Sequence, residues 1–212
     1  MNGANKRFCD KKERQMKHLN YILWLITFIG MSVLKASAYD ACIEGIYYNL
    51  DSKAKTAEVT SGDSKYTGSV AIPVSVENKG VVYPVTSIGK SAFEQCSRLT
   101  SVSIPNGVLS IKDDAFYGCT ELVDIEMPSS VKSIGDAAFV YCQKIKSITI
   151  PEGVERIGRD FFYGCRNLKN VTLPQTITEI GELAFGDCFN LTSISIPDPV
   201  ISIEIMAFRG CI

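Results

Sequence analysis

The C-terminal part of this sequence repeats itself every 23 residues, and this period constrains the fold more strongly than any other feature. Each repeat carries a phenylalanine at one fixed position and, three residues later, a cysteine. A strict period between about 20 and 50 residues is typical of solenoids, in which each repeat forms one coil and buries its apolar side against its neighbours. The sequence therefore predicts a stack of similar coils, marked by Phe93, Phe116, Phe139, Phe162, Phe185 and Phe208 and by Cys96, Cys119, Cys142, Cys165, Cys188 and Cys211.

Each repeat contains two short extended segments. The first follows the pattern L-x-x-V-x-I, as in residues 99–104, and its alternation predicts a strand with one buried face. A proline closes this strand, and a second segment with the pattern V-x-x-I follows, as in residues 108–111. Strands repeated at a fixed spacing are expected to stack in parallel, about 4.8 Å apart. The remaining x-x-A-F-x-x-C segment is predicted to form one helical or 3-10 turn, with the phenylalanine filling the space between layers.

The columns of Phe, Cys and Pro over residues 85–212 resemble the BspA-like leucine-rich repeat family, which consists of exported surface proteins of bacteria and protists. This resemblance implies a leucine-rich-repeat solenoid: a right-handed, mainly β, β/α superhelix of parallel strands with short helical or 3-10 turns. We therefore assign residues 85–212 to 23-residue repeats, the last of them incomplete. The resemblance also implies a non-enzymatic, adhesin-like role, secreted or at the cell surface, with host or neighbouring-cell proteins as partners.

Residues 39–84 do not show the repeat. They contain short β-prone runs, such as residues 45–50 and 56–60, separated by turn-rich segments that fit antiparallel hairpins. The first coil of a solenoid exposes an apolar end and an unpaired strand edge, which favours aggregation unless it is covered. We therefore predict that residues 39–84 form a β-rich N-terminal cap. A ligand-binding β module is the alternative.

Residues 1–38 have the features of a signal peptide. A basic start is followed by an apolar run over residues 21–34 and by Ala36-Ser37-Ala38, a typical cleavage site. Translation could begin at Met16, and an uncleaved membrane anchor is the alternative. Residues 1–38 hold seven of the 22 Lys/Arg and two of the 23 Asp/Glu, so residues 39–212 carry a net charge of about −6. This acidic body argues against nucleic acid as a partner, and membrane association is expected only through the leader.

Six of the eight cysteines occupy one column, which does not suit disulfide formation. Stacked side chains about 4.8 Å apart do not reach the Cβ separation that a disulfide needs, and a line of thiols cannot converge on one metal ion. We expect inert, buried thiols. Cys42 lies outside this column and could pair with one of its members or stay free.

The sequence offers little for catalysis. Its single histidine, His18, lies in the predicted leader, which removes His-dependent nucleophilic and metal sites from the remaining chain. Acidic groups such as Asp113-Asp114 lack the spacing of a dedicated Ca²⁺ loop. We therefore expect no cofactor and no metal, and an enzyme is the least favoured class. A structural or decoy surface protein without a specific ligand is the main alternative to a recognition module.

Candidate binding residues lie at the outward positions of the first strands and in an aromatic group after the phenylalanines. Five strands of four residues give a strand face of roughly 300 Å², whereas a standard interface buries roughly 800 Å² per partner. Loops, the cap or avidity would have to contribute. The tyrosines could instead be half-buried packing. The candidate residues are Ser101, Ser103, Asp124, Glu126, Ser147, Thr149, Asn170, Thr172, Ser193 and Ser195 on the strands, with Tyr117, Tyr141 and Tyr163.

Two departures from the repeat are expected to matter. Phe161 stands in a column that is otherwise alanine, so it must either enlarge the local core or project outward. The chain stops at Ile212, directly after Cys211, without a polar capping repeat. Because solenoid ends require such a cap for solubility, we expect that the sequence is truncated or that this open end self-associates.

Overall fold

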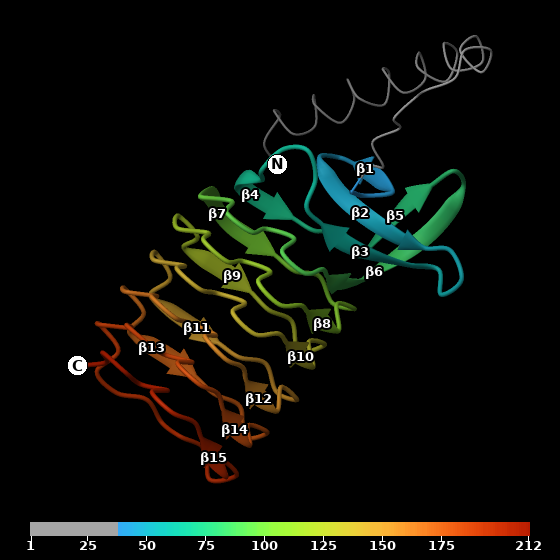
Figure 1. The fold of residues 1–212 in the computed structure, drawn as a ribbon. Coiled ribbons are helices and arrows are strands. Elements are labelled where there is room, and N and C mark those ends of the chain that lie inside the picture. Colours follow the sequence, from blue (N-terminus) through green and yellow to red (C-terminus); the bar gives the residue numbers. More distant parts are fainter. Residues whose placement is uncertain (1–37) are drawn as a thin grey trace, which may run out of the picture.

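The computed structural model describes residues 38–212, and the predicted leader lies outside the described residues apart from Ala38. The coils stack along one axis, with two rows of short strands running down the stack (Figure 1). We number five coils from their first apolar residue: coil 1 (99–121), coil 2 (122–144), coil 3 (145–167), coil 4 (168–190) and coil 5 (191–212). The strands are β1 (Ala41–Ile43), β2 (Ile46–Asp51), β3 (Thr56–Thr60), β4 (Thr67–Ala71), β5 (Ser75–Asn78), β6 (Val81–Ile88), β7 (Arg98–Ser103), β8 (Ser110–Ile111), β9 (Asp124–Glu126), β10 (Ser133–Ile134), β11 (Ser147–Thr149), β12 (Arg156–Ile157), β13 (Asn170–Thr172), β14 (Glu179–Ile180) and β15 (Ser202–Ile203).

The predicted parallel strands are confirmed. The first row runs through β4, β7, β9, β11 and β13, and the second runs through β3, β6, β8, β10, β12, β14 and β15. Where neighbours within a row pair in the repeats, they pair in parallel with counterparts one repeat apart, as Val102 with Ile125 and Ile111 with Ile134. The apolar residue of each pattern faces inward because strand side chains alternate between the two faces.

The third side of each coil is a chain of tight turns and not the helical turn expected from the sequence. In coil 1, the amides of Tyr117 and Cys119 donate to the carbonyls of Asp114 and Phe116, three residues back. Asp114 and Gly118 have positive φ values of 56° and 71°, and such residues interrupt helical geometry. The equivalent positions repeat this conformation in the other coils. Residues 38–212 contain no α- or 3-10 helix, and thus none with the length and apolar character of a membrane span.

The repeated phenylalanines form a continuous stack through the core. Neighbouring ring centroids lie 5.0 Å apart for Phe93 and Phe116 and 5.3 Å apart for Phe116 and Phe139. Each ring is thus a layer spacer, as the sequence predicted. Phe161 is also fully buried, so of the two expected outcomes it enlarges the local core.

The cysteine column is reduced, as expected. Each thiol from coil 1 onward donates to the carbonyl of the phenylalanine in the preceding coil, for example Cys142 to Phe116 at 3.2 Å. Burial raises the pKa of Cys96 to about 11 and that of Cys188 to about 12, so the thiols are poor nucleophiles at neutral pH. Cys42 is disulfide-bonded, and the six column cysteines are free, so both alternatives considered for Cys42 are wrong.

The segment before the repeats contains an extra, irregular coil. β1, β2 and β3 form antiparallel pairs, as expected for a hairpin-rich head, but β3 pairs in parallel with β6 and β4 pairs in parallel with β7. Both rows therefore continue into residues 56–71. The β5–β6 hairpin is inserted after this coil, and β6 runs across the expected boundary at residue 84.

Three tyrosines extend the aromatic stack into this head. The ring of Tyr66 lies 4.7 Å from that of Phe93, and Tyr47 and Tyr39 follow at 5.7 and 4.6 Å. A Cβ at Gly62 would lie 2.2 Å from the Tyr47 ring, so this position must be glycine for the ring to enter the stack. The rings of the head thus pack directly on the first of the stacked phenylalanines.

Candidate functional site

The candidate strand residues form one exposed face over the first row. Ser101 is half-buried and donates to Ser69 Oγ of β4 at 2.7 Å. The other nine are exposed, as the alternation predicted: Ser103, Asp124, Glu126, Ser147, Thr149, Asn170, Thr172, Ser193 and Ser195.

The middle of this face is hollowed by a depression of about 460 Å³. It lies where β9 faces β11, with Asp124 and Glu126 on one side and Ser147 and Thr149 on the other. Six of the ten candidate strand residues line it, so the structure brings these six together around one concavity. The full lining is Asp124, Ile125, Glu126, Met127, Ser129, Ser147, Ile148, Thr149, Pro151, Asn170 and Thr172.

The depression follows from a break in both strand rows. The first row divides into β4-β7-β9 and β11-β13, and the second divides between β10 and β12. Within residues 38–212, this is the one coil interface at which both rows are interrupted. We call this strand-side gap between coils 2 and 3 the seam.

Backbone bonds that recur at other interfaces are missing across the seam. In coils 2 and 4, the amides of Val123 and Lys169 each donate at 2.9 Å to the coil before. The equivalent bond from Lys146 in coil 3 does not occur among the described residues, and neither does that from Glu155. The turn side of the same interface remains joined, since the amide of Phe139 donates to Phe161 and that of Tyr141 to Tyr163. Coils 2 and 3 therefore diverge from the turn side towards the strands.

Phe161 gives a physical reason for this divergence. Its ring replaces an alanine methyl and lies 5.6 Å from Phe139 of coil 2 and 4.7 Å from Phe162. The planes of Phe139 and Phe162 differ by 20° across the seam. The angle is 3° between coils 1 and 2 but 29° between coils 3 and 4, where both strand pairs form, so ring tilt does not distinguish the seam. Because protein interiors are close-packed, we infer that the added ring separates the two coils on the strand side, while the hydrogen bonds of the turn side hold them together.

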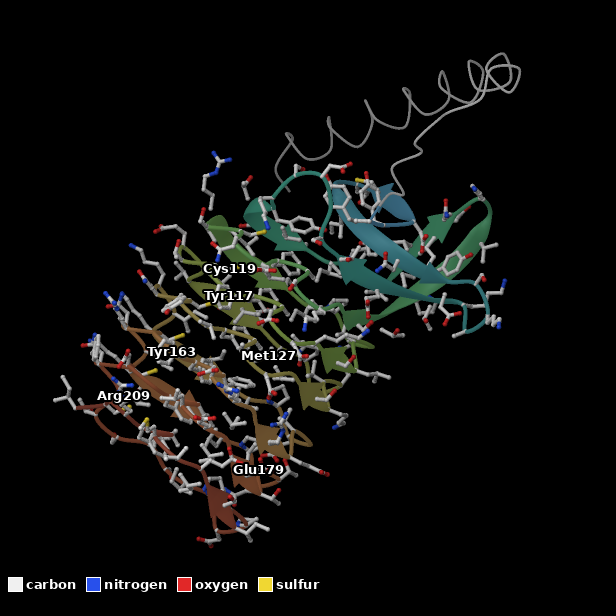
Figure 2. All side chains as sticks on the ribbon, viewed as in Figure 1. Tyr117, Cys119, Met127, Tyr163, Glu179 and Arg209 are labelled. Atoms are coloured by element: carbon white, nitrogen blue, oxygen red, sulfur yellow. The ribbon has the colours of Figure 1, made fainter. Side chains whose placement is uncertain are left out.

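Two apolar residues of coil 2 line the depression. Ile125 is half-buried, as are its counterparts in coils 4 and 5, whereas Val102 in coil 1 and Ile148 in coil 3 have relative exposures of 2% and 5%. Met127 is likewise half-buried (labelled in Figure 2). Sequence reasoning missed Ile125 and Met127 because they occupy inward positions of the repeat. The signal that could have indicated them is Phe161 in the alanine column.

The two openings of the seam differ in how they are spanned. On the second row, Arg156 Nη2 of coil 3 lies 2.8 Å from Asp136 Oδ1 of coil 2, and Lys132 Nζ donates to the Glu152 carbonyl at 3.1 Å. These side chains replace the missing strand pairing there. On the first row, neither Asp124 nor Glu126 has an ion-pair partner within residues 38–212. Among the described residues, no ion pair therefore spans the first-row opening beneath the candidate face.

The candidate tyrosines lie on the turn side and do not join the strand face. Their rings meet edge to face, with centroids 5.9 Å apart for Tyr117 and Tyr141 and 5.7 Å apart for Tyr141 and Tyr163. All three are half-buried, which supports the packing alternative. A hydrogen bond to the Asp187 carboxylate raises the pKa of Tyr163. Figure 2 shows Tyr117, Tyr163 and Arg209 following one another along the stack.

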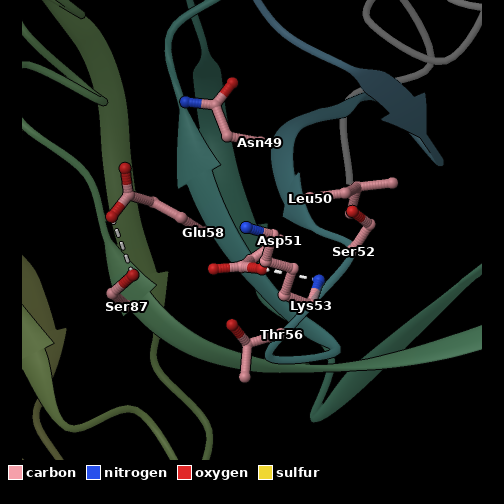
Figure 3. A pocket seen from close by; sticks show the side chains of 8 residues that line it. All are labelled: Asn49, Leu50, Asp51, Ser52, Lys53, Thr56, Glu58 and Ser87. Carbon is pink, nitrogen blue, oxygen red and sulfur yellow. Dashed lines mark hydrogen bonds between the residues drawn. The ribbon is translucent and has the colours of Figure 1, made fainter.

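A second depression, of about 520 Å³, lies at the junction of the cap and the coils (Figure 3). Its central carboxylate, Glu58, accepts a hydrogen bond from Ser87 Oγ at 2.9 Å and pairs with Lys112 Nζ at 2.5 Å. Glu58 thereby ties β3 to β6 and coil 1. The amides of Lys53 and Ala54 donate to Asp51 at the rim and lower its pKa. These polar groups bond to one another, so we assign this depression a structural role.

Metal-binding groups and reactive thiols were the remaining kinds of site that the sequence raised. In residues 38–212, no three His, Cys, Asp or Glu side chains are grouped so that they could hold a metal ion. The column cysteines donate to carbonyls and have raised pKa values. What the strand face can do chemically is form hydrogen bonds and ion pairs with another molecule.

Comparison with known proteins gives one family. The family described as BspA type leucine-rich repeat region matches residues 86–212 in six copies. A leucine-rich repeat protein of Bacteroides ovatus is 34% identical, with a TM-score of 0.63, over 81% of this chain and 51% of its own. A leucine-rich cell surface protein of Faecalibacterium prausnitzii is 32% identical, with a TM-score of 0.64, over 85% of this chain and 54% of its own.

The leucine-rich repeat protein of Treponema pallidum is 30% identical, with a TM-score of 0.64, over 74% of this chain and 78% of its own. No curated protein matches the chain. The chain spans about half the length of the Bacteroides and Faecalibacterium proteins. The similarity therefore establishes the fold and the repeats, and it does not extend to the activities of those longer proteins.

Proposed function

This chain belongs to the BspA-type leucine-rich repeat family, and we propose that it is a non-enzymatic recognition module that binds a protein at the cell surface or outside the cell. Leucine-rich repeat proteins of this kind generally act in protein interaction. The finer proposal is that the partner is a host or neighbouring-cell protein and that it contacts the first strand row of coils 1 to 4.

The observation that carries this proposal is the depression in the strand face. A flat face of roughly 300 Å² is small beside the roughly 800 Å² that each partner buries in a standard interface. A hollow of about 460 Å³ at its centre gives the face a concave surface that can receive a side chain of a partner. Buried anchors of this type contribute most of the binding energy in many protein complexes.

The proposed location is supported by two separate observations. A similar protein from Faecalibacterium prausnitzii is a cell surface protein, and the N-terminal sequence has the features of a signal peptide. We infer that this protein is exported, and that it is exposed to partners outside the cell.

Capture from extracts tests the function. The purified protein is immobilised and incubated with host extracellular-matrix extract and, separately, with bacterial surface extract. We expect saturable capture of a defined protein that Ser147→Arg, which places a long side chain in the depression, weakens at least tenfold. Gln175→Arg adds the same charge at an exposed turn residue and should leave capture unchanged.

Two results would contradict the proposal. The first is the absence of capture from both extracts. The second is unsaturable, salt-sensitive binding of many proteins that both variants share, which is what a structural or decoy surface protein would give.

A further inference from the structure

We propose that the first-row opening of the seam receives a lysine or arginine side chain from the protein partner. The charged group would lie beside Asp124 and Glu126, and the aliphatic stem would pack on Ile125 and Met127. This inference rests on the proposed function and specifies the chemistry of the segment that the site recognises.

The depression has two carboxylates at its edge whose negative charge no described residue neutralises. Asp124 and Glu126 are two residues apart on one strand, so both project from the same face of β9. Both are exposed, and the lining of the depression contains no lysine or arginine. On the opposite opening of the same seam, Arg156 neutralises Asp136. A partner cation at Asp124 and Glu126 would provide on the first row the kind of ion pair that the protein itself provides on the second.

Beneath these carboxylates, the lining of the depression is apolar. Ile125 and Met127 are half-buried, and Ile148 and Pro151 complete the apolar part of the lining. Lysine and arginine bury their methylene stems on apolar surface while the charged head remains near water and polar groups. The arrangement of an apolar floor with two carboxylates at its edge suits these side chains better than it suits a short polar or a purely apolar one.

Hydrogen-bond acceptors line the side of the depression opposite the two carboxylates. Ser147, Thr149 and Asn170 stand on the coil 3 and coil 4 side, and each offers a side-chain oxygen as an acceptor. An arginine guanidinium has five N–H donors in a fixed fork and can bond to a carboxylate and a second acceptor together. We therefore expect arginine to bind more tightly than lysine.

Size and coordination exclude other cationic or bulky occupants. A volume of about 460 Å³ accommodates a long side chain and its neighbouring backbone, but not a helix. Ca²⁺ takes six to eight oxygen ligands, commonly from several carboxylates, and this lining has two carboxylates, both on one strand.

The test uses short peptides as probes and the isotope-labelled whole protein as the receptor. Blocked pentapeptides Gly-Ser-Xaa-Ser-Gly, with arginine, lysine or glutamine at the centre, are titrated at fixed ionic strength while amide NMR signals are followed. We expect the arginine and lysine peptides to shift the signals of residues 124–127 and 147–149. The glutamine peptide should bind at least tenfold more weakly.

Charge-matched variants separate the seam from general attraction to an acidic protein. The double variant Asp124→Asn, Glu126→Gln should weaken the arginine peptide at least tenfold. The control Glu121→Gln, Glu155→Gln removes the same charge at exposed positions outside the depression and should change the affinity less than twofold. Phe161→Ala, which we expect to close the seam, should also reduce binding while both carboxylates remain.

Three results would overturn this inference. They are equal binding of the glutamine and arginine peptides, equal weakening by the control variant, and shifts confined to residues outside the seam. In the capture experiment, a partner that is lost with Ser147→Arg but retained by the Asp124→Asn, Glu126→Gln variant would refute the cationic anchor and leave the proposed function standing.

Discussion

Two adjacent coil interfaces in this molecule have nearly the same repeat residues but different geometry. Between coils 1 and 2, β7 pairs with β9, β8 pairs with β10, and the stacked rings of Phe116 and Phe139 are within 3° of parallel. Between coils 2 and 3, neither strand pair forms and Phe161 adds a second ring beside the stack. The first interface is closed on all three sides, and the second is closed on the turn side alone.

A single substituted column therefore coincides with a change in the geometry of one coil interface. Coil 2 contributes Ala138 to the regular interface, whereas coil 3 contributes Phe161 to the divergent one, and both side chains are fully buried. The repeat provides rigidity through its ring stack and turn-side bonds. The departure from the repeat provides a hollow on a face that would otherwise be flat.

The largest expected effect is the loss of a stacking ring at the regular interface. Phe116→Ala removes a fully buried ring held between Phe93 and Phe139, and we expect it to lower the free energy of unfolding by about 3–5 kcal/mol. Urea denaturation followed by circular dichroism measures this change. A loss below about 1 kcal/mol would show that the stack does not support the regular interface as described.

A smaller effect is expected from Phe161→Ala, although this ring is equally buried. The alanine matches the other coils, so the coils can close and recover strand pairing, and we expect a loss of about 1–2 kcal/mol in place of the 3–5 kcal/mol typical of Phe→Ala. Amide hydrogen exchange should slow at least tenfold at Lys146 and Glu155 as their backbone bonds form.

The reverse substitution, Ala138→Phe, is the matched control for this prediction. It places a ring at the regular interface, where we expect overpacking to cost about 1–3 kcal/mol and exchange at Val123 and Lys132 to accelerate. Unchanged exchange at Lys146 in Phe161→Ala would show that the ring does not hold the seam open.

The smallest effect concerns the side chains that span the second-row opening. Asp136→Asn removes the ion pair with Arg156 between exposed side chains, and we expect a loss of about 0.2–1 kcal/mol. The loss should decrease at high salt, because ions screen exposed pairs. Asp113→Asn alters the equivalent carboxylate of coil 1, where strand pairing holds the interface, and should cost less. Equal losses in the two variants, measured by urea denaturation, would contradict the special role of Asp136.

Much of the face could be predicted from the sequence because strand alternation is a local property. The pattern L-x-x-V-x-I placed Asp124, Glu126, Ser147 and Thr149 outward, and the structure has them exposed. The depression itself could not be predicted in this way. It lies where neither β9 nor β10 pairs with the next coil, and this break in pairing is a tertiary feature that strand alternation does not specify.

The extra coil in the head was hidden for a different reason. Val59 pairs with Ile88 and Ser69 pairs with Ser101, offsets of 29 and 32 residues in place of 23. The inserted β5–β6 hairpin changes the spacing, and tyrosine replaces phenylalanine in the stack at Tyr66. A search for a strict period therefore stops at residue 85, although the parallel rows continue to β3 and β4.

The sequence by itself determined the solenoid, its strand rows and the buried columns. In a stack of equal coils, the neighbours of each residue are its own counterparts one repeat away. A column of identical residues therefore predicts which side chains pack against each other. Only the tertiary structure decided where the rows break and what covers the first coil. The ring of Phe161 acts through space on strands that lie before it in the chain, and its effect depends on how the turn side holds coils 2 and 3 together.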